Sequence, residues 1–127
     1  MQLHRFLLIA ALTAARLLGQ APAKPKVTQV LAILTVNDGV DREQLTKVMP
    51  GEVRSTVQLY LDGRIQQWFS RGDGKGVVFV LDCKTVEEAK ALMDSLPLSK
   101  QKFVTFEYMP LGPLMPLRYL MTPATAQ

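Results

Sequence analysis

The sequence predicts an α+β fold with the element order β-α-β-β-α-β, the arrangement called ferredoxin-like. Three observations predict it. Four runs rich in β-branched and aromatic residues alternate with segments of helical periodicity. The second and third runs are separated only by turn residues, without a helix. A chain of 127 residues is long enough for one domain with its own core.

The N-terminal segment, residues 1–23, has the layout of an export signal. Arg5 precedes the apolar run 6–15, and Ala21-Pro22-Ala23 supplies the small residues that a signal peptidase recognises. The run is too short to span a membrane, which needs about 20 apolar residues. We therefore expect a cleaved signal peptide and a periplasmic or secreted protein. The alternative is an uncleaved N-terminal helix at a membrane interface, and this is the only membrane contact expected.

Charge and rare residues limit the function classes. The chain carries a net charge of +4, and removing Arg5 and Arg16 with the signal leaves 13 cations and 11 anions, or +2. Because the cations are scattered among acids, we expect no nucleic-acid partner. Cys83 is the only cysteine, which excludes a disulfide within the chain, and His4, the only histidine, lies in the signal. We therefore expect no metal site and no histidine catalysis.

The first predicted strand is 27–36 (VTQVLAILTV), which is apolar enough to be buried. Asp41 and Gln44 form a capping box that begins a helix. Pro50 is expected to end that helix and to begin a second one, since a proline inside a helix costs about 3 kcal/mol. The second helix, 51–61, carries one apolar stripe, which is typical of a buried face.

Two strands joined by a hairpin follow. Residues 64–71 (RIQQWFSR) predict a mixed strand and 76–83 (GVVFVLDC) a strongly apolar one. The glycines and Asp73 of the intervening RGDGKG predict a tight turn. A phosphate-binding loop is excluded because neither Ser nor Thr follows Lys75, and no helix begins there.

The remaining elements complete the sheet. Thr85 and Glu88 form the capping box of the next helix, and 102–109 is the fourth strand. The tail after it has four prolines and cannot be one regular element. Right-handed crossovers place both helices on one face, with the first and third strands central. The open apolar face and the apolar tail predict a homodimer or larger homo-oligomer.

The middle of the chain resembles the muconolactone isomerase-like branch of the dimeric α/β-barrel proteins. The resemblance covers residues 27–117, which we take as the domain, with 118–127 as a C-terminal tail. The matching features are Trp68 on the second strand, Gly72 to Gly76 at the hairpin, the apolar third strand, Glu88-Ala89 in the helix and Leu96-Pro97-Leu98 after it.

The resemblance implies a ferredoxin-like protomer whose open sheet face packs on a second protomer. It also implies a pocket between sheet and helices or at the barrel mouth. Small aromatic-derived or carboxylate ligands are implied, bound without a metal or organic cofactor. The isomerase itself moves a proton to shift a double bond in an unsaturated lactone.

Proton transfer needs a carboxylate in a partly dry pocket and a cation for the developing enolate. The candidate catalytic residues are Glu107, in an apolar strand, and Glu52, expected in the first turn of its helix. Each has a structural alternative: Glu107 as a solvent-facing edge residue or ion-pair partner, and Glu52 as a complement to the helix dipole.

The candidate substrate-binding residues are two arginines and three side chains with flat or amide groups. Guanidinium binds carboxylates bidentately, and aromatic rings form flat pocket walls. Strict alternation along the second strand predicts that Gln66 shares a face with Trp68, and Gln67 one with Ile65. The alternative for Arg71 is that it protects an edge of the sheet against aggregation. The alternative for Trp68 and Tyr60 is that they are ordinary core residues. The candidates are Arg54, Tyr60, Gln67, Trp68 and Arg71.

The function hypothesis is an exported small-molecule-binding domain that isomerises an unsaturated lactone or aromatic-derived acid by proton transfer. The alternative is a non-catalytic ligand-binding or assembly protein of the same fold. A buried pocket with Glu107 or Glu52 beside an arginine favours the enzyme, and a purely apolar pocket favours the binding protein.

Overall fold

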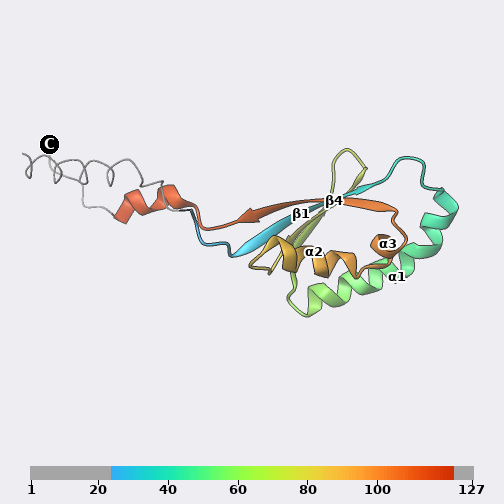
Figure 1. Cartoon of the computed structure of the whole chain (residues 1–127), viewed down its shortest axis with the longest axis horizontal. Helices are drawn as coiled ribbons and strands as arrows, with labels where there is room; N and C mark the ends of the chain where they lie inside the picture. The colour runs from blue at the N-terminus through green and yellow to red at the C-terminus, as the bar shows by residue number, and fades with distance from the viewer. Residues whose placement is uncertain (1–23, 122–127) are drawn as a thin grey trace, which may run out of the picture.

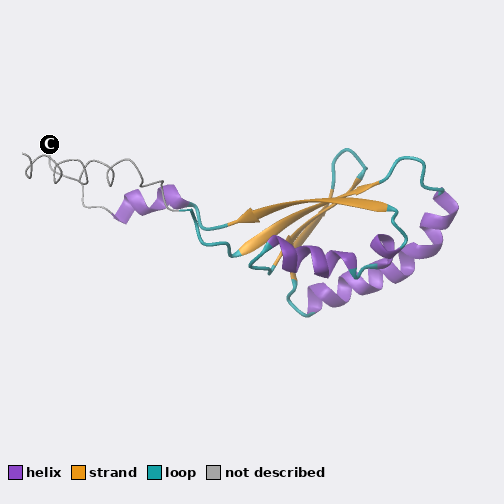
Figure 2. Cartoon of the chain, viewed as in Figure 1, coloured by secondary structure: helices purple, strands orange, loops and turns teal. Residues whose placement is uncertain are grey.

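The computed structural model describes residues 24–121. It consists of one sheet with helices on one of its faces (Figures 1 and 2). The predicted signal, residues 1–23, and residues 122–127 of the tail lie outside the described residues. The elements are β1 (Gln29–Val36), α1 (Arg42–Leu61), β2 (Ile65–Ser70), β3 (Gly76–Leu81), α2 (Val86–Asp94), α3 (Pro97–Lys100), β4 (Val104–Leu111) and η2 (Met115–Met121).

The sheet confirms the predicted fold class. Its four strands have the order β2-β3-β1-β4, and all neighbours are antiparallel. The apolar strands β1 and β3 are central, and β2 and β4 form the edges, as predicted. The connections through α1 and α2 give the β-α-β-β-α-β arrangement of a ferredoxin-like fold, with a short α3 before β4.

The core lies between the sheet and its helices. Alternate residues of β1 and β3 point toward the helices and are almost completely buried, as the period of two along a strand requires. Figure 2 shows all the strands in one layer, with α1, α2 and α3 on the same side of it. The core consists of Val30, Ala32, Leu34, Ile65, Phe79, Leu81, Cys83, Ala89, Met93 and Leu96.

Pro50 lies inside one continuous helix, so the predicted division into two helices is wrong. Proline cannot donate a hydrogen bond to the carbonyl of Thr46, four residues earlier. Both residues are exposed, so water can satisfy that carbonyl. The helix begins after Asp41, as predicted, whose side chain accepts a hydrogen bond from the Glu43 N–H at 2.9 Å.

The hairpin between β2 and β3 has the predicted turn. Gly74 has a φ of +72°, a conformation that other residues rarely adopt. The Asp73 side chain accepts a hydrogen bond from the Lys75 N–H at 2.9 Å and so fixes the loop. At Gly76 a side chain is excluded, because a Cβ atom would lie 2.0 Å from the carbonyl oxygen of Leu34.

A β-bulge in β2 overturns the predicted alternation. Ile65 pairs with Leu81 and Gln67 with Val80, so Gln66 is the extra residue. The bulge turns Ile65 and Trp68 toward the helices, and it turns Gln67 to the uncovered face. Gln66 does not share a face with Trp68.

Helix α2 and the tail agree with the sequence pattern. Thr85 accepts a hydrogen bond from the Glu88 N–H at 3.1 Å, and Glu88 accepts one from the Lys84 N–H at 3.0 Å. The tail is not one element: β4 continues to Leu111, and a 3-10 helix follows at η2. The predicted boundary at residue 117 falls within η2.

Candidate functional site

A cleft of about 660 Å³ opens between α1 and the helix-covered face of the sheet. One wall is α1, and the other is formed by β1, β2 and β3. The β2–β3 hairpin forms part of the rim, and α3 contributes one residue. The lining is mainly apolar: Leu34, Val36, Leu45, Met49, Val53, Val57, Trp68, Phe69, Val77, Phe79 and Leu98 accompany Glu52, Thr56, Ser70, Arg71, Gly74 and Gly76.

Glu52 is the buried carboxylate of this cleft, with only 5% of its surface exposed. Its Oε2 accepts a hydrogen bond from the Leu98 N–H at 2.9 Å. Burial raises the pKa of the Glu52 carboxyl above its ordinary value of 4.5, and the hydrogen bond from Leu98 opposes part of that shift. Because α1 begins at Arg42, Glu52 is in mid-helix, and the helix-dipole alternative is wrong.

Thr56 lies one turn after Glu52 on the same buried side of α1. Its hydroxyl donates to the carbonyl oxygens of Glu52 at 3.1 Å and Val53 at 3.0 Å. Sequence reasoning did not identify Thr56 as a cleft residue. The available signal was its spacing of four from Glu52, which places two polar side chains on one side of a helix.

The buried side of α1 is polar at its centre, between the half-buried apolar residues Leu45 and Leu59. Glu52 and Thr56 are its two buried residues. The predicted apolar stripe is instead partly exposed: Val53 is 49% and Val57 39% exposed, and both line the cleft. An apolar surface of this kind, with a buried polar pair beside it, is more informative than apolar exposure alone.

Trp68 forms a flat wall of the cleft. The bulge in β2 is what turns it toward α1. The ring of Tyr60, on α1, stacks on Trp68 with centroids 4.7 Å apart and an interplanar angle of 15°. Tyr60 does not line the cleft, so it supports Trp68 from behind instead of contacting a ligand there.

Arg71 is held at the rim where β2 ends. Its Nη1 donates to the hydroxyl of Thr35 at 2.5 Å and to the Leu34 carbonyl at 3.4 Å, and its Nη2 bonds Asp73 at 2.5 Å. The Lys75 N–H and the Arg71 guanidinium lower the pKa of the Asp73 carboxyl. These bonds use three of the five N–H donors of a guanidinium, which leaves donors for a ligand carboxylate.

Three predicted site residues lie away from the cleft. Arg54 is exposed on α1, and Gln67 is exposed on the uncovered face of the sheet. Glu107 is exposed on β4 and lines a separate polar hollow of about 370 Å³ with Lys75 and Thr105. The structure therefore brings together Glu52, Trp68 and Arg71, with Tyr60 behind Trp68.

No family model matches the chain, and no curated protein matches it. Within residues 24–121 no group of three or more His, Cys, Asp or Glu side chains is arranged to hold a metal ion. No helix in this part of the chain is long and apolar enough to cross a membrane.

Proposed function

We propose that the protein binds a small planar carboxylic acid or unsaturated lactone in the cleft beside α1 and isomerises it by proton transfer, as muconolactone isomerase-like proteins do. The observation that carries the proposal is the combination of a buried carboxylate, Glu52, with an arginine, Arg71, in one largely apolar cleft. The volume of about 660 Å³ is within the range of small-molecule sites.

The proposed reaction moves one proton and needs no metal or organic cofactor. Ionised Glu52 removes a proton from the carbon between the carbonyl group and the double bond. The C–H electron pair forms a dienolate, and the same proton is then returned to the far carbon, which shifts the double bond and regenerates Glu52. A carboxyl whose pKa is raised by burial suits both steps, because it takes and returns a proton with a smaller energy difference.

Arg71 and Trp68 have supporting parts in this reaction. The guanidinium of Arg71 binds the substrate carboxylate or stabilises negative charge on the enolate oxygen. Trp68 packs against the planar carbon skeleton. A ligand that fills the cleft displaces water from its apolar lining, which strengthens the electrostatic interaction.

A specific observation favours a second candidate, a non-catalytic binding protein. The residue that precedes α3, Leu96, offers no side-chain cap, and Glu52 supplies the missing acceptor to the Leu98 N–H. In this second candidate Glu52 only stabilises α3, and the cleft binds its ligand without changing it.

We further propose a homodimer or larger oligomer formed through the uncovered face of the sheet. Phe69 and Met109 are 58% and 54% exposed. Both lie on this face with the outward residues of the central strands, Leu31, Ile33, Val78 and Val80, and Phe69, on the edge strand β2, also borders the cleft. Export with cleavage of residues 1–23 belongs to the same proposal.

The decisive experiment combines a thermal-shift screen with direct detection of isomerisation. Unsaturated lactones and aromatic acids are added to wild type, Glu52→Gln and the matched control Glu107→Gln. The enzyme proposal predicts that a compound that raises Tm is isomerised by wild type and Glu107→Gln, but not by Glu52→Gln. Binding without turnover by any of the three chains favours the binding protein, and no Tm shift with any compound contradicts both functions.

A further inference from the structure

The C-terminal arm, residues 112–121, is an apolar segment that is largely exposed beyond Gly112. None of the residues of η2 is buried. In a 3-10 helix residues three apart eclipse one another, so Leu114, Leu117 and Leu120 form one ridge. The exposed fractions along the arm are 65% for Leu114, 55% for Leu117, 68% for Tyr119, 81% for Leu120 and 85% for Met121.

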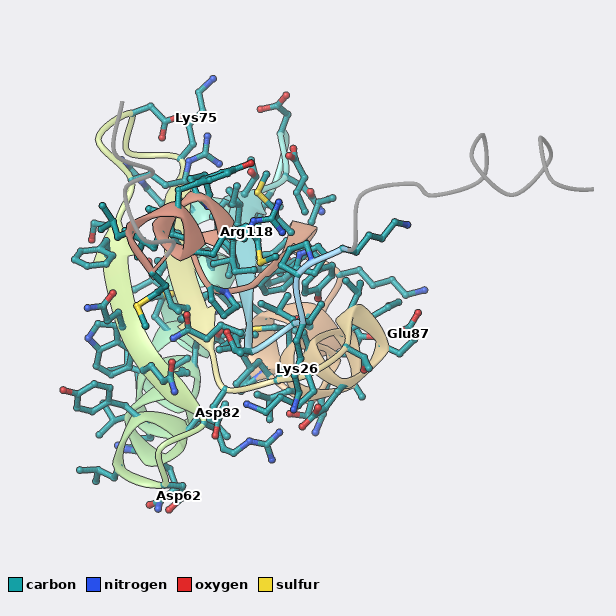
Figure 3. The ribbon with its side chains drawn as sticks, turned by 90° about the vertical axis from the view of Figure 1, so that its left-hand side faces the viewer. Lys26, Asp62, Lys75, Asp82, Glu87 and Arg118 are labelled. Atoms are coloured by element: carbon teal, nitrogen blue, oxygen red, sulfur yellow. The ribbon has the colours of Figure 1, made fainter. Side chains whose placement is uncertain are left out.

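The arm leaves the domain beside the N-terminal segment. The Thr28 N–H donates to the Leu111 carbonyl at 2.9 Å. Gly112 packs so closely that a Cβ atom there would lie 2.6 Å from the Lys26 carbonyl oxygen. Figure 1 shows η2 beyond the end of the sheet at which β1 begins. Figure 3 views this end directly, with Arg118 and Lys26 both in the central part of the molecule.

Charge is segregated along the chain between the terminal segments and the domain. All 11 acidic residues lie from Asp38 to Glu107, so neither the first 37 residues nor the arm contains one. Of the 15 cations, five lie outside residues 27–107, which leaves ten cations against 11 acids in the domain itself. Lys24, Lys26 and Arg118 lie at the described end, and none of the ion pairs found within residues 24–121 includes them. Asp82 lies at the same end but is paired with Lys84, whose Nζ also donates to the Thr28 carbonyl (Figure 3).

We propose that this arm, with Lys24 and Lys26, docks the protein on an anionic lipid bilayer surface. An apolar ridge flanked by cations and free of acids is the pattern of an interfacial membrane segment. The Arg118 guanidinium lies over the Tyr119 ring at 5.3 Å, and such a pair combines an interfacial aromatic ring with a cation. A second copy is the weaker occupant, because its domain has almost equal numbers of cations and acids and so offers little charge complementarity.

The first test places a fluorescent reporter on the arm of the full chain. Trp68 is the only tryptophan, so Tyr119→Trp in a Trp68→Phe background reports from the arm alone. Vesicles of phosphatidylcholine, with and without about a third of phosphatidylglycerol, carry brominated acyl chains that quench an inserted indole. The matched control, Met49→Trp in the same background, is in the N-terminal half of α1, away from the arm (Figure 1).

We expect the Tyr119→Trp chain to be quenched on anionic vesicles and to lose that quenching at high salt, while the Met49→Trp chain is not quenched. An arm tryptophan that stays unquenched while the protein sediments with vesicles overturns the proposal.

A second test measures vesicle partitioning of the full chain. The pair Leu117→Ser and Leu120→Ser should lower it by about tenfold or more. Replacing Lys24, Lys26 and Arg118 by glutamine should lower binding to anionic vesicles by about fivefold for each charge. If the two serines leave partitioning unchanged and instead reduce the mass of the oligomer, the partner of the arm is a second copy and the proposal is wrong.

Discussion

The two long helices of the domain cover the same face of the sheet but differ in what they bury. Helix α2 follows the ordinary rule: its buried residues, Ala89 and Met93, are apolar. Helix α1 buries Glu52 and Thr56 and leaves Val53 and Val57 partly exposed in the cleft. The difference teaches that α2 closes the core, whereas α1 also forms one wall of the cleft.

The largest expected effect on stability is in α2. Met93 is fully buried, so Met93→Ala should lower the free energy of unfolding by about 2–5 kcal/mol through lost burial and a cavity. Ligand affinity per folded molecule should not change. Urea denaturation measures the first and isothermal titration the second. A loss below about 1 kcal/mol would contradict the claim that α2 closes the core.

The next effect is at the buried carboxylate of α1. Glu52→Ala removes the acceptor of the Leu98 N–H and should cost about 1–3 kcal/mol in unfolding free energy. Glu52→Gln keeps an oxygen that can accept this hydrogen bond and should cost less. Glu87→Ala, at an exposed carboxylate of α2, serves as the control and should change stability by about 1 kcal/mol or less. Equal costs at Glu52 and Glu87 would remove the contrast between the helices.

A smaller effect is expected from pH, and its sign follows from the raised pKa of Glu52. Compared with the unfolded chain, the folded state favours the protonated form of Glu52. The contribution of this group to stability is therefore fully present below pH 4.5, and it is lost as pH rises through the folded-state pKa. Wild type should therefore lose stability relative to Glu52→Gln as pH rises. Denaturation of both chains between pH 4 and 8 measures the difference. A wild type that gains stability over this range would show that the hydrogen bond outweighs burial.

The smallest effect on stability is expected at the apolar side chains that α1 exposes. Val53→Ser and Val57→Ser should each change the free energy of unfolding by about 1 kcal/mol or less, since both side chains are already partly exposed. Affinity for a cleft ligand should nevertheless fall. Serine variants that destabilise the fold by as much as Met93→Ala would mean that α1 packs like α2.

The sequence predicted the fold well because the relevant signals are local. Each signal depends only on residues close to it in the sequence. This holds for the glycines and Asp73 of the hairpin, for the Thr85 cap and for the apolar strands. Strand hydrophobicity also placed β1 and β3 correctly in the centre. The division of α1 at Pro50 failed because the cost of a proline falls where the freed carbonyl is exposed to water.

The site was predicted only in part. Glu52, Trp68 and Arg71 line the cleft, but strict alternation could not reveal the bulge at Gln66 that turns Trp68 inward. Thr56 was missed because an apolar stripe on a helix normally predicts its buried face. Only tertiary packing against β2 and α3 shows that Glu52 and Thr56 are the buried residues of α1.

The most direct test of the account follows methyl groups by NMR as a lactone or aromatic acid from the thermal-shift screen is titrated into the full chain. We predict that the methyl signals of Val53 and Val57 shift in a saturable way, while that of Met93 does not move. Saturable shifts at Leu31 and Ile33 on the uncovered face, with Val53 and Val57 unaffected, would contradict the assignment of the cleft beside α1 as the binding site.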